Sequence, residues 1–153
     1  MSGPNRNRTD GTASLEADWI FADIGGTNAR FARWREGIGT GDIWRRRADE
    51  FPTLAQAAET FERGQPDTAR RAALAVALQI RGTRLRMTNR SWSFDVQALR
   101  RELGLDELRL FNDFVAAAAG LPALGGDEID VLRSGKAASG HWLLIGPGTG
   151  LGA

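Results

Sequence analysis

The sequence contains no cysteine, a single histidine and a single lysine among its 153 residues. Without cysteine the chain can form no disulfide, no thiolate metal site and no cysteine nucleophile, which is typical of a reducing compartment. The lone histidine, His141, stands without a catalytic partner group, so we expect it to be structural or surface-exposed. Because Lys136 is the only lysine, we expect any side chain that contacts a phosphate to be an arginine.

Long apolar runs are also missing. The longest, residues 114–124, is shorter than the roughly 18 to 20 residues that cross a bilayer, and Gly120 and Pro122 interrupt it. The 20 basic and 19 acidic residues nearly cancel, to a formal charge of +1, which favours neither nucleic acid nor a membrane surface as partner. We therefore expect a cytoplasmic protein with no nucleic-acid and no membrane partner.

The chain divides into three predicted parts. Residues 1–18 are polar and carry no apolar run like that of a signal peptide, so we expect a flexible leader. Residues 19–134 are predicted to form one lobe, in keeping with 42% apolar and 25% charged residues, which are ordinary values for a globular domain. Residues 135–153 are predicted to be a linker, a strand and a glycine loop that begin a second lobe.

The spacing of apolar residues predicts an α/β fold. Short alternating runs predict strands at residues 19–22, 31–34, 42–47, 72–76, 85–88, 108–111 and 141–145, the first three forming a meander. Helical periodicity predicts helices at residues 52–61, 96–103 and 114–119, with Ser93 or Asp95 as the N-cap of the second. We therefore expect a mixed sheet with flanking helices.

A glycine turn follows the first predicted strand. Gly25 and Gly26 lack side chains, so unpaired backbone N–H groups there could approach phosphate oxygens, and the Thr27 hydroxyl adds a donor. Phosphate would repel Asp23 unless a cation lay between them, which points to Mg²⁺ or its water shell. An ordinary hairpin, in which Gly-Gly and Asp are common turn residues, explains these residues equally well.

A polar pair, Asn112 and Asp113, ends the strand predicted at residues 108–111. Ligands of open α/β sheets bind at the carboxyl ends of strands, where a carboxylate can accept a hydroxyl proton during attack on phosphorus. Asn112 can both donate to and accept from sugar hydroxyls. Helix capping is the alternative, and for this pair alone it is favoured, because Asn and Asp are preferred caps and a helix follows.

A second glycine-rich turn occupies residues 146–152, directly after the last predicted strand. Alternating glycines with Thr149 are typical of an anion-binding turn. The segment also fits a relaxed dinucleotide pattern, Gly148-x-Gly150-x-x-Ala153, but no helix follows it. No Gly-Lys-Ser or Gly-Lys-Thr occurs anywhere in the sequence, so a Walker A loop is excluded.

Together these motifs resemble, in order and spacing, the N-terminal half of bacterial glucokinases, which have actin-like, hexokinase-like ATPase folds with a ribonuclease H-like lobe. The matching segments are residues 21–30, 87–92, 112–114 and 146–152. The resemblance implies transfer of the γ-phosphoryl group of ATP, with Mg²⁺, to the C6 hydroxyl of glucose, the first step of glycolysis. Glucose and ATP would then be the partners of this kinase.

Site residues are carried over from the resemblance by position. Asp113 would be the general base, and Asn112 and Asn89 would contact the sugar, although Asn89 could equally be a turn residue. Asp23 would also hold Mg²⁺ through water. The two phosphate loops would be formed by Ala22, Asp23, Ile24, Gly25, Gly26 and Thr27, and by Gly148, Thr149 and Gly150.

The sequence departs from the family in two small ways and one large one. Ala22 stands where glycine is frequent, and residues 78–80 replace a stretch that usually holds proline. The Gly-Glu-Gly-Gly-His segment, whose Glu and His bind sugar in the family, and the adenosine pocket do not occur in residues 1–153. We therefore expect weak ligand binding and no measurable kinase activity from these residues alone, and association through apolar surface exposed near residues 143–152.

Two alternatives remain open at this point. A non-catalytic sugar-sensing or regulatory relative would keep the fold, but it would need neither Asp23 nor Asp113. Residues 1–18 are also too short and too polar to hold a DNA-binding helix-turn-helix. A truncated gene product without a function of its own is the other alternative.

Overall fold

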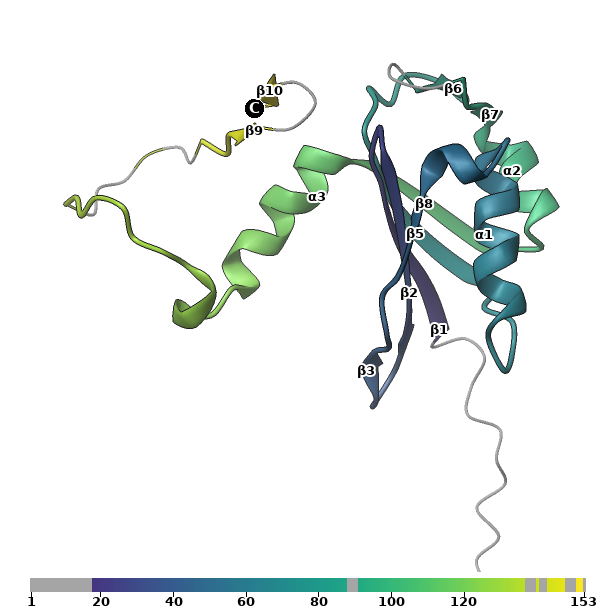
Figure 1. Ribbon diagram of the computed structural model, residues 1–153, viewed down its shortest axis with the longest axis horizontal. Helices are drawn as coiled ribbons and strands as arrows, with labels where there is room; N and C mark the ends of the chain where they lie inside the picture. Colours follow the sequence, from purple (N-terminus) through teal and green to yellow (C-terminus); the bar gives the residue numbers. More distant parts are fainter. Residues whose placement is uncertain (1–17, 88–90, 137–139, 141–142, 148–150, 153) are drawn as a thin grey trace, which may run out of the picture.

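The computed structural model describes residues 18–87, 91–136, 140, 143–147 and 151–152. A sheet lies at the centre, with α1 and α2 on one side of it and α3 on the other (Figure 1). The α-helices are α1 (Leu54–Arg63), α2 (Val96–Glu102) and α3 (Asp113–Gly120). The strands are β1 (Asp18–Ile24), β2 (Asn28–Arg35), β3 (Gly39–Thr40), β4 (Trp44–Arg47), β5 (Arg71–Val76), β6 (Arg84–Arg86), β7 (Ser93–Asp95), β8 (Glu107–Asn112), β9 (Gly146–Pro147) and β10 (Leu151–Gly152).

The main sheet is mixed, with strand order β3-β2-β1-β5-β8 and β4 also paired to β2. β1 runs antiparallel to β2, which confirms the predicted hairpin, and β4 returns along β2 as the third strand of the meander. β1, β5 and β8 are parallel to one another. Antiparallel and parallel pairs in one sheet, with helices beside it, confirm the predicted α/β class and mixed sheet. Parallel neighbours also require crossover connections between β1, β5 and β8.

The hydrophobic core lies between the sheet and the helices α1 and α2. Alternate residues of each strand face it, as a pleated strand requires. On β1 these are Ile20, Ala22 and Ile24, each at most 8% exposed. On α1 the apolar stripe of Leu54, Ala55, Ala57, Ala58 and Phe61 is buried against them.

The two helices on that side begin at side-chain caps. The Thr53 hydroxyl accepts the Gln56 N–H at 3.1 Å and so begins α1. An Asp95 carboxylate oxygen accepts the N–H groups of Gln97 and Ala98 at 3.0 and 2.9 Å, which confirms Asp95 as the N-cap of α2. These hydrogen bonds to the charged cap also lower the pKa of Asp95 below its ordinary value.

An ion cluster lies at the end of the sheet where β1 begins. The guanidinium of Arg33, whose side chain is 3% exposed, donates to Glu62 at 2.8 Å, to Asp67 at 3.0 Å and to Asp18 at 3.3 Å. Arg35 pairs with the same two aspartates. The Nε of Arg33 is buried without a hydrogen-bond partner. The cluster joins β1, β2, α1 and the turn after α1.

Two predicted strands differ in the structure. Residues 85–88 were expected to form one strand, and β6 ends at Arg86 and pairs with β7. Residues 141–145 are predicted to form a buried strand, and that prediction is wrong for residues 143–145, which belong to no strand. Residues 141 and 142 lie outside the described residues. Leu143 and Ile145 are 75% and 54% exposed. Their apolar pattern is that of a strand, but a strand forms only where a neighbouring edge pairs with it.

No helix within the described ranges is both long and apolar enough to pass through a bilayer.

Candidate active site

The strand register brings two of the predicted motifs to one edge of the sheet. Ile24, at the end of β1, pairs with Val76 on β5, and Val76 pairs with Asn112 on β8. The first glycine turn follows Ile24 directly, and Asp113 follows Asn112. Because adjacent strands lie about 4.8 Å apart, these two segments are separated by roughly 10 Å along this edge.

The first turn is held by backbone hydrogen bonds, one within the hairpin and one from Ala48. The Gly25 N–H donates to the carbonyl of Asn28 at 2.9 Å, and the Ala48 N–H donates to the carbonyl of Thr27 at 2.9 Å. The expectation that the Gly25 N–H is unpaired is therefore wrong, because the hairpin uses it. Thr27 is exposed, so a ligand at this turn can meet its hydroxyl.

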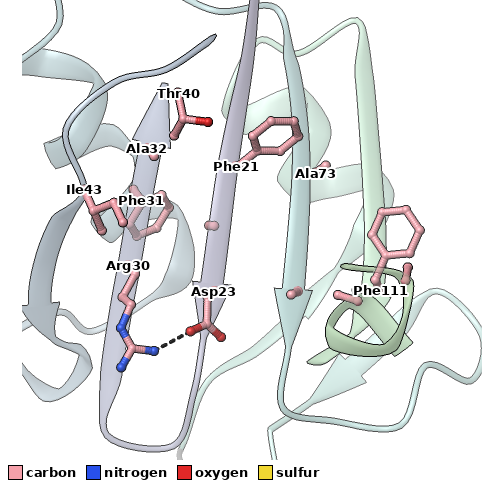
Figure 2. A pocket seen from close by; sticks show the side chains of 13 residues that line it. Phe21, Asp23, Arg30, Phe31, Ala32, Thr40, Ile43, Ala73 and Phe111 are labelled. Atoms are coloured by element: carbon pink, nitrogen blue, oxygen red, sulfur yellow. Dashed lines mark hydrogen bonds and ion pairs between the residues drawn. The ribbon is translucent and has the colours of Figure 1, made fainter. Parts of the chain in front are cut away.

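Asp23 forms an ion pair with Arg30 across the hairpin. The two residues are opposite each other in the β1–β2 register, and Figure 2 shows their side chains facing each other near the turn. The side chains of Arg30 and Asp23 are 38% and 48% exposed. No group of three or more His, Cys, Asp or Glu side chains able to hold a metal occurs in the described part of the chain. A single carboxylate fits Mg²⁺ that arrives with phosphate groups and keeps most of its water.

Asn112 occupies the corner between β8 and α3. Its Oδ1 accepts the N–H groups of Phe114 at 3.0 Å and Val115 at 3.3 Å, so it is the N-cap of α3. Its Nδ2 donates to the carbonyl of Leu78 at 3.1 Å. With Oδ1 used by the helix, the amide can offer a ligand its remaining N–H as a donor.

Asp113 is the first residue of α3 and is half-buried. One carboxylate oxygen, Oδ1, accepts the Phe114 N–H at 3.0 Å. The predicted strand-to-helix corner is confirmed, and it leaves the carboxylate at the carboxyl edge of the parallel strands, where ligands of open sheets bind.

The second glycine turn is described only at its two strands. β9 and β10 form an antiparallel pair in which Gly146 is opposite Gly152. A Cβ atom built on Gly146 would lie 2.6 Å from Cζ of Phe114, so the hairpin packs against the start of α3. Gly148, Thr149 and Gly150, predicted to bind phosphate, and Asn89, predicted to contact sugar, lie outside the described residues.

A pocket of about 470 Å³ lies between α3 and the face of the sheet opposite the core. Its lining includes Phe21, Ala73, Phe111 and Ala116, and the Asp23–Arg30 pair stands at one end (Figure 2). Apart from Asp23, Arg30 and Thr40, the lining residues are apolar. A sugar or a phosphate group needs more hydrogen-bond partners than this surface offers, so the strand edge is the better candidate site.

Sequence reasoning missed three residues at this site. Arg30 lies in the first motif, but only the strand register shows that it faces Asp23. Leu78 contributes a backbone carbonyl, which no sequence pattern distinguishes. Phe114 follows Asp113 and has the sequence pattern of an ordinary apolar helix residue. Only the structure shows its contact with Gly146.

Comparisons with known proteins show the family of this chain. The glucokinase family model matches residues 20–153. A glucokinase of Ralstonia nicotianae is 39% identical over 139 residues, which cover 87% of this chain and 41% of that protein. The chain spans about two fifths of the length of this glucokinase and of the one from Cupriavidus pinatubonensis.

Two solved glucokinase structures are similar to this chain in fold. The crystal structure of a glucokinase from an Antarctic psychrotroph is similar with a TM-score of 0.69 and 29% identity, over 80% of this chain and 40% of that one. A glucokinase from Balamuthia mandrillaris, solved in complex with glucose, shares the fold with a TM-score of 0.55 and 20% identity, over 68% of this chain and 32% of that one. From its match over residues 20–153, this chain belongs to the glucokinase family.

Proposed function

We propose that residues 19–134 form the N-terminal lobe of a kinase that transfers the γ-phosphoryl group of ATP to the C6 hydroxyl of glucose. Residues 135–153 begin the connection to a second lobe in this proposal. The observation that carries the proposal is the register Ile24–Val76–Asn112, which places the first glycine turn and Asp113 at one edge. A base and a phosphate site must lie on the same edge for a hydroxyl at the base to face a phosphoryl group held at the turn.

Asp113 is proposed to be the general base. Its carboxylate accepts the proton of the C6 hydroxyl while that oxygen forms a bond to the γ-phosphorus. The bond between the γ-phosphorus and the bridging oxygen breaks, and ADP leaves with the electron pair. Because Asp113 is the first residue of α3, its carboxylate charge also lies near the positive end of the helix dipole.

Asn112 is proposed to hold the sugar and the first glycine turn to hold phosphate. The bonds to Leu78 and to the Phe114 N–H fix the Asn112 amide, and a sugar oxygen would accept its second Nδ2 hydrogen. At the turn, Thr27 is the exposed donor. Gly148, Thr149 and Gly150 are proposed to form the second phosphate loop, and Asn89 a further sugar contact.

Asp23 is proposed to face Mg²⁺ through water, with Arg30 beside it. Mg²⁺ bound with ATP supplies neutralisation of the phosphate charge. Because Arg30 already pairs with the Asp23 carboxylate, Asp23 would hold the metal through its coordinated water and not as a direct ligand.

A chimera tests the proposal. Residues 20–153 replace the matching segment of the Ralstonia nicotianae glucokinase, and glucose-dependent ADP release is measured in a coupled assay. We expect the chimera to be active and Asp113→Asn to lower kcat by about 10² to 10⁴, the usual contribution of a general base. The isolated chain is expected to show no turnover, because the family's other sugar and adenosine contacts lie outside the matched segment.

The matched control is Asp130→Asn, which removes an exposed carboxylate from a segment away from the strand edge. It should leave kcat unchanged. An active chimera in which Asp113→Asn retains kcat would contradict the proposed base. A folded chimera without activity toward glucose would contradict the proposed reaction for this lobe.

A further inference from the structure

The first turn of α3 is attached to the edge of the sheet by one side chain. Asn112 donates through Nδ2 to the carbonyl of Leu78 at 3.1 Å and accepts the Phe114 N–H through Oδ1 at 3.0 Å. Beside Leu78, the Ala77 N–H donates to the carbonyl of Ile24 at 3.0 Å. The backbone of Phe114 therefore has a fixed place relative to the end of β1, from which the first glycine turn begins.

The ring of Phe114 continues this series of contacts to the second hairpin. A Cβ atom on Gly146 would lie 2.6 Å from Cζ and 3.0 Å from Cε1 of the ring. Carbon atoms in ordinary contact are about 3.5 to 4.0 Å apart, so only a residue without a side chain lets the backbone come this near. Gly146 is paired with Gly152, so the strand that the ring contacts, β9, is also the strand that β10 pairs with.

We propose that Phe114 is a positioning residue whose ring sets the place of the β9–β10 hairpin beside Asp113. This inference rests on the proposed function, in which Asp113 takes the hydroxyl proton and the hairpin lies on the phosphate side. Asp113 and Phe114 are consecutive residues in the first turn of α3. The same turn therefore carries the base and the support of the hairpin, and their separation is set by local geometry.

The contact leaves no room for a side chain at position 146. An alanine there requires the ring or the hairpin to move by about 1 Å to restore ordinary contact. Misplacement by about 1 Å can cost roughly 100-fold in rate when the reacting groups must be aligned. Within the described ranges the core cluster ends at Leu105, with Leu108 and Leu110 packed against it, so position 146 lies outside the packing that holds the lobe together.

The test compares Gly146→Ala, Phe114→Leu and the double variant in the chimera described above, which supplies the adenosine contacts that residues 1–153 do not hold. Mg·ATP is titrated into ¹⁵N-labelled protein, and amide chemical shifts give the dissociation constant. We expect each single change to weaken Mg·ATP binding by about tenfold. Leucine lacks the ring atoms that an alanine at 146 would meet, so the double variant should bind no more weakly than Phe114→Leu alone.

Two controls and one spectroscopic readout separate positioning from general damage. Gly135→Ala adds a Cβ where nothing lies within 4 Å, and Val115→Ala trims the neighbouring side chain, which is 58% exposed. Both should bind Mg·ATP like the wild type. The Gly146 Hα resonance should show an upfield ring-current shift in the wild-type chain that disappears in Phe114→Leu.

The outcomes are distinguishable. Wild-type binding that Gly146→Ala and Phe114→Leu leave unchanged would overturn the positioning role while the proposed function stands. Additive losses in the double variant would overturn it as well, because two residues in contact should be coupled. Absence of any Mg·ATP-dependent shift in the wild type, with the ring-current shift present, would refute the proposed phosphate site and with it this role of Phe114.

Discussion

The Asp23 carboxylate at the end of β1 is paired with the guanidinium of Arg30 on the neighbouring strand. The pair lies on the sheet face opposite the core, at the edge where the first glycine turn begins (Figure 2). A carboxylate that would repel phosphate by itself thus has a cation beside it in the protein. The electrostatic character of this edge depends on the pair and not on Asp23 alone.

Arg30→Ala should have a small effect on stability. The two side chains are 38% and 48% exposed, and ion pairs exposed to this degree contribute about 0 to 1 kcal/mol. Urea unfolding of the wild type, Arg30→Ala, Asp23→Asn and the double variant measures the coupling. We expect a coupling below about 1 kcal/mol that decreases in high salt. A larger coupling that persists in salt would show that the pair is a structural element of the sheet.

Arg33→Met should be far more damaging. Arg33 is buried and contacts three carboxylates, so its loss leaves the half-buried Glu62 without its cation and Asp18 with Arg35 alone. Breaking a buried ion pair at one partner typically costs about 3 to 5 kcal/mol. Urea unfolding with Arg47→Met as control, where the lost pair with Asp49 is exposed, measures the difference. Equal losses in the two variants would contradict the structural role of the cluster.

Glu62 should make stability depend on pH. Burial raises the pKa of Glu62 above its ordinary value of 4.5, and the contacts with Arg33 and the Ala69 N–H only partly oppose this. A carboxyl with a raised folded-state pKa contributes stability that is fully present below pH 4.5 and lost as pH rises through the folded pKa. As pH falls through that window, the wild type should therefore gain unfolding free energy relative to Glu62→Gln.

The comparison with Glu62→Gln is needed because other carboxyls act in the opposite direction. Hydrogen bonds to the helix lower the pKa of Asp95, so its contribution is present above its unfolded value and lost as pH falls through the folded one. Asp95 is unchanged in both proteins and its contribution cancels. A difference that stays constant with pH would mean that Glu62 titrates normally.

Asn112→Ala should destabilise α3 and its attachment to the sheet. The change removes the helix cap, worth about 1 kcal/mol, and the hydrogen bond to the Leu78 carbonyl, worth about 1 kcal/mol. Asn112→Asp keeps a capping oxygen but turns the donor toward Leu78 into an acceptor, so it should lose the second contribution alone. Urea unfolding measures both variants. Equal stability of the wild type and Asn112→Asp would show that the bond to Leu78 contributes nothing.

The sequence predicted most of the elements that surround the site. Strands near residues 19–22, 31–34, 72–76 and 108–111 were found, as were α1, α2 and α3. Alternation and helical spacing are local signals, and one buried face fixes them strongly. Asp95 was one of the two candidate caps of α2, and its geometry shows that it is the cap.

The sequence was least informative where a feature depends on a distant neighbour. Residues 143–145 carry the apolar character of a buried strand, yet they pair with no strand and Leu143 is exposed. The Gly25 N–H was expected for phosphate and is bonded to the Asn28 carbonyl. Composition describes what a segment is able to bury or donate, whereas pairing depends on which surface or acceptor lies next to it.

The order and spacing of its motifs, without a structure, were enough to show the family of this chain, and its apolar periodicity was enough to predict the α/β class; Asp113 as candidate base came from the family resemblance. Tertiary structure decided which of these residues meet. It placed Arg30 against Asp23, joined Asn112 to Leu78 and brought the ring of Phe114 onto Gly146. Local sequence fixes backbone preferences within a few residues, but contacts between residues far apart depend on strand register and packing, which only the folded chain establishes.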